Sequence, residues 1–245
     1  MPGDVYIGTS GWSYDRWKDG FYAGVPRRNW FAHYCAHFGA VEVNATFYHS
    51  LKAATLESWL HNTPATFRFA AKAGRYLTHR LRLAFPEDAL ARERARLHPL
   101  FPKLAVVLWQ LPASLTCDLD RLSAFAAQLA SWPQTRHAIE FRHASWFQDD
   151  VAKLLADHAI ASVQSDAADW PFWERITTDL VYVRLHGHTT TYVSRYAASA
   201  LRAWAERIGR WRSERRDVHV YFDNTDAGHA VQNARQLANL LSGEG

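Results

Sequence analysis

The chain has 245 residues and 48% of them are hydrophobic, so a sizeable core can form and wholesale disorder is excluded. No apolar run approaches the roughly 20 residues that crossing a membrane requires, and the two cysteines stand too far apart to suggest a disulfide framework or a zinc knuckle. The net charge of +4 is carried mostly by arginine, with 23 Arg against 5 Lys. The N-terminus also lacks a basic start followed by an apolar stretch, so we expect no signal peptide, no membrane partner and a cytoplasmic location.

Eight short apolar segments recur along the chain at intervals of about 30 residues, and we predict a strand at each of them. In chain order they cover residues 5–10, 40–45, 67–72, 104–112, 137–142, 160–166, 180–187 and 218–224. Seven segments with apolar residues at helical spacing lie between them, at 27–38, 56–62, 87–101, 118–131, 145–159, 199–216 and 227–241. Several of these open on Asp or Ser, which are common helix caps.

Strands that alternate with helices in a chain of this length predict an α/β fold, here a single (β/α)8 TIM barrel spanning residues 1–245 as one domain. No low-complexity tract or Gly/Ser linker marks a domain boundary. The alternative is an open doubly wound sheet, which normally carries a glycine-rich fingerprint after its first strand. The segment GTSGWS has glycines at 8 and 11 followed by bulky Trp12, so it fits that fingerprint poorly and the barrel is favoured.

Polar side chains stand at regular positions in these apolar segments. In AVEVNA, Glu42 and Asn44 share one face of the predicted strand, and Glu140 and Arg142 do the same in HAIEFR. The outward face of a barrel strand packs under helices, so the polar face points into the lumen and forms the mouth near the carboxyl strand ends. Applied to every strand, this parity predicts a ring of polar residues at the mouth: Glu42, Asn44, Lys72, Gln110, Glu140, Arg142, Asp166, Arg184 and His186.

The last strand is ambiguous, since VHVYFDN could send either Asp223 or Asn224 inward. Aromatic residues also gather in the loops beside the polar strand ends, and they include Trp12, Tyr14, Tyr48 and Trp146. Aromatic walls of this kind stack sugars or bases. The alternative is that they seal the top of the barrel as small hydrophobic clusters.

Several segments, in one order, resemble the signature segments of the YecE-like family, also called domain of unknown function 72. They are IGTSGWSY, VEVNATFY, FRFAAKAGRYLTH, LWQLP, IEFRHASW, VRLHG and VYFDN, and they run nearly from end to end of the chain. The resemblance implies a TIM-barrel fold and supplies no activity. One departure is FDN, where we expect Asn-Asn after the aromatic residue, so Asp223 adds a carboxylate.

The mixed-charge ring favours an enzyme of hydrolase or lyase type that acts on a small polar, anionic or phosphate-bearing substrate. We expect Lys72, Arg142 and Arg184 to hold the anion while a glutamate and His186 carry protons. The predicted catalytic residues are Glu42, Glu140, Asp166 and His186. The predicted substrate-binding residues are Trp12, Tyr14, Asn44, Tyr48, Lys72, Gln110, Arg142, Trp146, Arg184 and Asn224. A non-catalytic scaffold that keeps the ring as a salt-bridge layer is the structural alternative.

Other ligand classes stay open. His186 and His188 have a spacing that metals favour, but the nearby Lys and Arg residues would repel a cation, so we expect no cofactor. The segment DNTDAGHAV starts a helix after the last strand, where barrels often bind phosphate, or where Thr225 or Asp226 caps the helix.

Nucleic acid is the runner-up partner, either as the ligand of a binding protein or as the substrate of a metal-dependent nuclease. It is suggested by the arginines that follow the third strand and by aromatic rings able to stack bases; these arginines are Arg75, Arg80 and Arg82. Most of the remaining arginine excess is better explained by solvated helix faces. The sequence does not indicate the oligomeric state.

Overall fold

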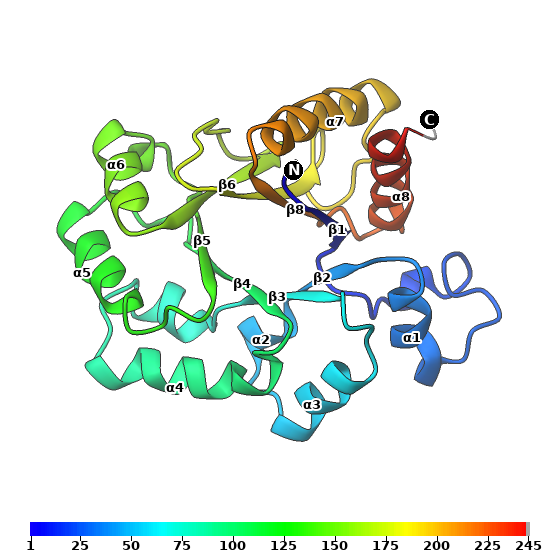
Figure 1. The fold of residues 1–245 in the computed structure, drawn as a ribbon, viewed down its shortest axis with the longest axis horizontal. Coiled ribbons are helices and arrows are strands. Elements are labelled where there is room, and N and C mark those ends of the chain that lie inside the picture. The colour runs from blue at the N-terminus through cyan, green and yellow to red at the C-terminus, as the bar shows by residue number, and fades with distance from the viewer. Residues whose placement is uncertain (244–245) are drawn as a thin grey trace. The chain divides into compact units, whose positions relative to one another are not determined.

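The computed structural model describes residues 1–243, whose strands and helices alternate along the chain (Figure 1). The strands are β1 (Val5–Thr9), β2 (Ala40–Val43), β3 (Arg68–Lys72), β4 (Leu104–Gln110), β5 (Arg136–Glu140), β6 (Ile160–Ala167), β7 (Leu180–Gly187) and β8 (Asp217–Phe222). The α-helices are α1 (Trp30–Cys35), α2 (Ala45–Tyr48), α3 (Ala53–His61), α4 (Glu87–Leu97), α5 (Leu119–Leu129), α6 (Asp149–Asp157), α7 (Ala198–Ser213) and α8 (His229–Ser242). Among these described helices, none has the length and apolar character that a membrane crossing requires.

The strands form one sheet in the order β1-β8-β7-β6-β5-β4-β3-β2. Neighbouring strands run parallel, for example β7 and β8 over Leu180–Leu185 and β4 and β5 over Val106–Gln110. A parallel bridge between Ser10 and Glu42 joins the ends of the first and last strands of this order. Parallel strands with intervening helices in this order define an α/β fold of the (β/α)8 class, which confirms the predicted TIM barrel.

Five predicted strands end one or two residues earlier than their apolar pattern indicates, and β2 and β5 are among them. Strand β2 ends at Val43, and Asn44 has helical angles (φ −80°, ψ −22°) as the residue that precedes α2. Strand β5 ends at Glu140, so Arg142 lies beyond it. The predicted strands 40–45 and 137–142 were therefore too long at their carboxyl ends, because alternation of faces holds only while the backbone stays extended. The predicted position of Asn44 and Arg142 at the mouth stays a prediction.

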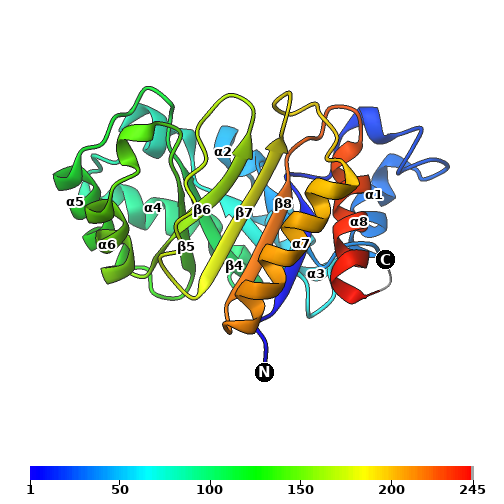
Figure 2. The ribbon, with the colours of Figure 1, turned by 90° about the horizontal axis from the view of Figure 1, so that it is seen from above.

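The chain divides into two compact units, of which the first contains Met1–Glu42, Gln164–Phe172 and the chain from Asp179 onward. Its core forms where α7 lies along β8, with α8 beside it (Figure 2). Leu201, Trp204, Ile208 and Trp211 recur every three or four residues of α7, so they share one helix face, and all of them are buried. Helix α8 begins after Gly228, which has φ +73°; no side chain caps this end, so neither Thr225 nor Asp226 caps α8.

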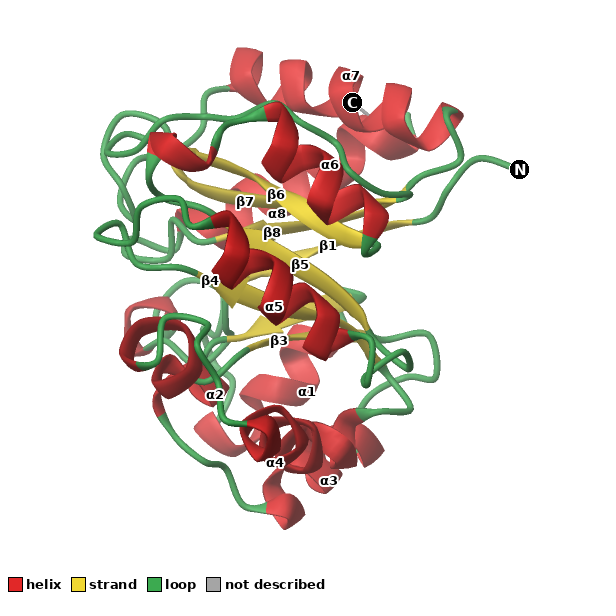
Figure 3. Ribbon diagram, turned by 90° about the vertical axis from the view of Figure 1, so that its left-hand side faces the viewer, coloured by secondary structure: helices red, strands yellow, loops and turns green. Residues whose placement is uncertain are grey.

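The second unit contains Val43–Val163 and Trp173–Thr178. Its helices α5 and α6 lie side by side (Figure 3). The Asp118 side chain accepts the Arg121 N–H and caps α5, as the predicted Asp cap requires. The ring of Phe125 in α5 then packs edge-on against Trp109 of β4 at a centroid distance of 5.0 Å. The assignment of residues 1–245 to a single domain stays a prediction.

Candidate functional site

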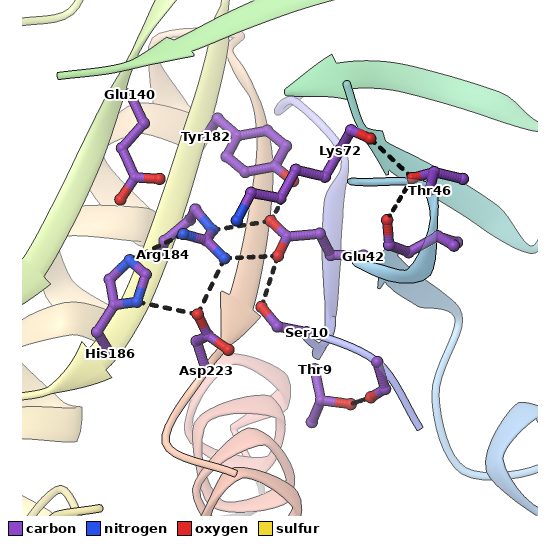
Figure 4. Close-up of polar contacts among 12 residues, drawn as sticks. Thr9, Ser10, Glu42, Thr46, Lys72, Glu140, Tyr182, Arg184, His186 and Asp223 are labelled. Carbon is purple, nitrogen blue, oxygen red and sulfur yellow. Dashed lines mark hydrogen bonds and ion pairs between the residues drawn. The ribbon is translucent and has the colours of Figure 1, made fainter. Parts of the chain in front are cut away.

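Glu42 is the centre of a buried polar cluster in the first unit (Figure 4). Arg184 of β7 binds both carboxylate oxygens, with Nη2 2.8 Å from Oε1 and Nε 2.9 Å from Oε2. Ser10 Oγ donates to Oε1 and the Tyr182 hydroxyl donates to Oε2, each at 2.7 Å. Glu42 and Arg184 are both 0% exposed, so the pair depends on these hydrogen bonds to offset the cost of burying two charges.

Arg184 extends this cluster to Asp223 and His186. Its Nη2 donates to Asp223 Oδ2 at 3.0 Å, and its Nη1 lies 3.1 Å from His186 Nε2. Because a guanidinium only donates hydrogen bonds, His186 Nε2 accepts, which assigns the imidazole proton to Nδ1. That nitrogen lies 3.0 Å from Asp223 Oδ2, and the Asp223 side chain is 11% exposed. Asp223 is therefore the member of this group of three that meets solvent.

Asp223 and Asn224 point in different directions, which resolves the ambiguity of the last strand. Asp223 joins Arg184, whereas Asn224 Nδ2 donates to the Ser194 carbonyl at 2.9 Å and to Asn233 Oδ1 at 3.0 Å. Asn224 thus connects the end of β8 to the loop between β7 and α7, and to helix α8. The structure does not bring it into the charged cluster.

Aromatic side chains cover the His186 end of the cluster. Trp170 packs edge-on against the imidazole at a centroid distance of 4.8 Å, and Tyr192 does so at 5.6 Å. The Tyr14 hydroxyl donates to the Ser10 carbonyl. Burial, followed by the negative charge of Asp223, raises the pKa of Tyr14 well above its usual value, so its phenol remains a hydrogen-bond donor at neutral pH.

Gly187 sets the path of the loop that carries Tyr192. Its φ of +112° suits glycine alone, and a Cβ there would lie 2.5 Å from the Thr190 carbonyl oxygen. We therefore expect Gly187→Ala to lower the free energy of unfolding by about 2 kcal/mol, measured by urea denaturation. Gly209, inside α7, has no atom within 4 Å of the corresponding position and is the matched control. Gly209→Ala is expected to stabilise the protein by up to about 1 kcal/mol. Equal effects of the two substitutions would contradict this account.

The two histidines of the His-x-His segment have different partners. His186 contacts Arg184, whereas His188 Nδ1 lies 3.1 Å from Asp166 Oδ1 with its side chain 68% exposed. Among the side chains that the structure describes, no group of three or more His, Cys, Asp or Glu is placed to hold a metal ion. The guanidinium beside His186 would also repel a cation.

The second unit has its own charged cluster at the carboxyl ends of β3 and β5. Lys72 ends β3, and its Nζ lies 4.2 Å from the centre of the Phe47 ring. Glu140 ends β5 with 0% exposure, and the Nε of Arg142 lies 3.7 Å from its Oε1. Gln110 is the β4 residue opposite Glu140 in the strand register, and its side chain is buried.

His79 lies in the field of this second cluster. Its ring packs edge-on against Phe47 at a centroid distance of 5.0 Å, and its Nδ1 is 2.9 Å from Thr78 Oγ1. Burial, followed by the positive charges of Lys72, Arg75 and Arg142, lowers the pKa of His79 to about 4. A histidine with this pKa is neutral at pH 7, and three cationic side chains act on it.

Other predicted site residues lie apart from these charged groups. Trp146 is fully buried, where it stacks on Phe141 at 4.7 Å and donates its Nε1–H to the Leu115 carbonyl. Trp12 packs against Phe31 at 4.6 Å, while Tyr48 is 66% exposed. Asn44 Oδ1 is buried and has no hydrogen-bond partner in the described structure. The roles predicted for these residues remain untested.

Sequence reasoning missed Ser10, Trp170 and Tyr192. Ser10 had a detectable signal, because strand parity places it two positions after Gly8 on the polar face of β1. Trp170 and Tyr192 lie in loops, and no periodic pattern predicts which loop side chain folds back over a strand end.

These features define the class of protein. It is a (β/α)8 barrel protein whose strands carry charged, hydrogen-bonded side chains at their carboxyl ends, where barrels of this class place their chemistry. The chain belongs to the family described as "Protein of unknown function DUF72", whose model matches residues 6–245. This confirms the family resemblance found in the sequence.

Similar proteins match nearly the whole chain. UPF0759 protein YunF of Bacillus subtilis is 28% identical over 97% of this chain and 94% of its own length. The crystal structure of a DUF72 family protein from Thermotoga maritima has a TM-score of 0.88 at 27% identity, covering 98% of this chain and 99% of that one. A DUF72 family protein from Enterococcus faecalis has a TM-score of 0.83 at 21% identity, covering 97% of this chain and 95% of that one, and shares the fold.

Proposed function

We propose that the protein is an enzyme that holds a small anionic substrate with Lys72 and Arg142 and moves a proton through Glu140. The observation that carries this proposal is the gathering of cationic side chains around His79, next to a fully buried carboxylate, at the ends of β3 and β5. Acid–base enzymes need this combination, because a fixed positive field binds the substrate and a positioned carboxylate transfers the proton.

The surroundings of Lys72 and Arg142 suit an anion. The Lys72 ammonium lies over the face of Phe47, and its side chain is only 7% exposed, so its charge acts in a partly desolvated setting. Arg142 offers a planar guanidinium, which matches the paired oxygens of a carboxylate or phosphate. Together they favour a substrate with one such group over a neutral sugar.

Glu140 is the proposed general acid or base. Its carboxylate has no exposed surface and is ordered by the nearby Arg142, so it is oriented before substrate arrives. A carboxylate beside a bound anion is suited to remove a proton next to a carbonyl or to activate water. These are the steps of a lyase and a hydrolase, respectively.

The cluster of the first unit is proposed to hold a separate proton-transfer pair of its own. Arg184 is fixed by both oxygens of Glu42, so it can hold Asp223 and His186 in one orientation. In this proposal Glu42 is an anchor, because four donors occupy its oxygens, and Asp223 with His186 is the reactive pair.

The proposal is tested by thermal denaturation in the presence of inorganic phosphate and of a panel of small anionic metabolites. A ligand at 100 times its Kd stabilises the folded state by about 2.7 kcal/mol, which raises Tm by roughly 5–10 °C in a chain of this size. Lys72→Met and Arg142→Met should lose most of this shift, while Glu140→Gln should keep it.

Lys153→Met removes an exposed lysine that pairs with Asp157 and serves as the matched control. It should respond as the wild-type protein does. An undiminished shift in Lys72→Met would reject the proposed anion site.

A further inference from the structure

A separate pocket opens in the second unit between the end of α2, the segment after β3 and helix α4. Its volume is about 290 Å³, at the lower end of the range typical of small-molecule sites. We call it the tyrosine pocket, because Tyr48 and Tyr76 both line it and are 66% and 59% exposed. Large side chains this exposed are few among the described residues, and two of them share this one pocket.

The base of the tyrosine pocket is built from polar groups that satisfy one another. Glu93 is only 6% exposed, and its carboxylate accepts the Gly74 N–H and the Arg96 Nε–H, each at 2.9 Å, as well as an Arg96 Nη2–H. Arg96 Nη1 donates to the Thr46 carbonyl at 2.9 Å. These two charges are therefore committed to structure, and they hold α4 against the segment after β3.

Two other arginines at the pocket remain available to a ligand. No carboxylate among the described side chains pairs with Arg75, and this arginine lines the pocket in an exposed position. Arg92 pairs with Asp88 one helical turn away, but both side chains are more than 60% exposed. An exposed pair of this kind is easily exchanged for another anion.

We propose that the tyrosine pocket binds a nucleotide, with its base stacked on Tyr48 or Tyr76 and its phosphate on Arg75 or Arg92. Planar rings stack on aromatic side chains without a requirement for particular hydrogen bonds, and the exposed arginines supply the charge that a phosphate needs. The volume admits one base, so this chemistry could come from a free mononucleotide or from one residue of a single strand. The proposal stands on residues other than Lys72, Arg142 and Glu140, so it is independent of the proposed enzyme.

The backbone also holds Tyr76 in place. Tyr76 begins a single π-helical turn, Tyr76–Arg80, which is followed by Arg82 and Leu83 at φ values of +51° and +68°. Leu83 is buried and donates its N–H to the Leu77 carbonyl at 3.2 Å. Turns of this type are uncommon and recur at functional sites. Here the turn presents the tyrosine ring outward from a fixed base.

The test is isothermal titration calorimetry with adenosine 5′-monophosphate and with a single-stranded oligoadenylate of six residues. Both probes should bind, whereas inorganic phosphate alone should bind at least 10-fold more weakly than the nucleotide.

Tyr48→Ala or Tyr76→Ala should weaken binding by about 10-fold, because one stacked base is lost. The matching Tyr→Phe variant should stay within about 3-fold of wild type, because it keeps the ring. Arg75→Gln or Arg92→Gln should weaken both probes and flatten the salt dependence.

Matched controls are Phe172→Ala, an exposed aromatic outside the pocket, and Arg202→Gln, an exposed arginine of α7. Thermal unfolding checks that every variant is folded. A six-residue strand that binds far more tightly than the mononucleotide, with a slope of log affinity against log salt steeper than about −1.4, identifies a nucleic-acid strand as the source. Similar affinities identify a free nucleotide.

The proposal would be overturned if neither probe bound, or if the pocket variants and the controls weakened binding equally. It would also be overturned if Lys72→Met abolished binding while Tyr76→Ala left binding unchanged. The ligand would then lie at the charged cluster around Lys72.

Discussion

Replacing Arg184 with methionine is expected to lower the free energy of unfolding by about 3–5 kcal/mol, measured by urea denaturation at pH 7. The substitution removes the guanidinium that binds both oxygens of Glu42. Among the described residues, this fully buried carboxylate then keeps the neutral donors Ser10 and Tyr182. It also removes the cation from Asp223. A single unpaired buried charge costs more than the ion pair contributes, so the loss should be large even if the pair itself is nearly neutral in net stability.

Two controls test whether the loss of stability comes from the buried, unpaired carboxylate or simply from the removal of one positive charge. Lys153→Met breaks an exposed ion pair with Asp157 and should change stability by less than about 1 kcal/mol. The double variant Glu42→Gln, Arg184→Met should be more stable than Arg184→Met alone, because the buried carboxylate is gone. An Arg184→Met protein within 1 kcal/mol of wild type would contradict this description of the cluster.

His137 should make the protein lose stability in acid. It is buried in the second unit, where its Nδ1 accepts the Trp109 Nε1–H at 3.2 Å and its Nε2 lies 3.1 Å from the Trp132 carbonyl oxygen. Burial lowers the pKa of His137 to about 4, against 6.5 in an unfolded chain. The unfolded chain therefore takes up a proton first as the pH falls, which favours unfolding.

The contribution of neutral His137 to the free energy of unfolding is fully present above pH 6.5. It is lost as the pH falls from 6.5 towards 4, by about 3 kcal/mol in total. His137→Gln is expected to be less stable than wild type at pH 7, because its neighbours lose their partner. The stability difference between the two proteins should shrink by about 3 kcal/mol between pH 7 and pH 4. Urea denaturation across this range gives the measurement, and a difference that is constant with pH would show that His137 does not titrate as proposed.

The sequence was sufficient to predict the eight strands and their order of alternation with helices. The segment LVYVRLHG corresponds to β7, Leu180–Gly187, because the Leu and Val residues at alternate positions give the strand the apolar face that packs under helices. The ends of strands were less predictable. Asn44 continues the alternation of β2 in sequence, but the backbone turns into α2 at that residue, and local hydrogen bonds that a hydropathy pattern does not encode decide such a turn.

The sequence predicted which residues lie on the polar face better than it predicted which of them hydrogen-bond to one another. Parity placed Glu42, Arg184 and His186 on the polar face, and the structure joins these three in one cluster. It did not indicate that Glu42 would receive four donors, because Ser10 and Tyr182 come from other strands and their distances depend on strand register and tilt. Trp146 illustrates the opposite case: a loop aromatic beside a polar strand end lies inside the core against Phe141.

The two charged clusters surround different central side chains. In the first unit Arg184 is enclosed by two carboxylates, so its charge is balanced within the cluster. In the second unit the positive charges of Lys72, Arg75 and Arg142 act together on His79. We therefore assign the proposed substrate anion to the second cluster, and the proposed pair of Asp223 and His186 to the first.

The most direct measurement is the pKa of His79 by NMR, with and without inorganic phosphate, with the resonance assigned by its absence in His79→Gln. The account predicts a pKa of about 4 in the free protein and a rise of at least about one unit when phosphate binds, because an anion offsets the positive field. Lys72→Met should raise the pKa in the free protein and reduce the response to phosphate. A His79 pKa that does not change at saturating phosphate, or that changes equally in Lys72→Met and wild type, would contradict the proposed anion site.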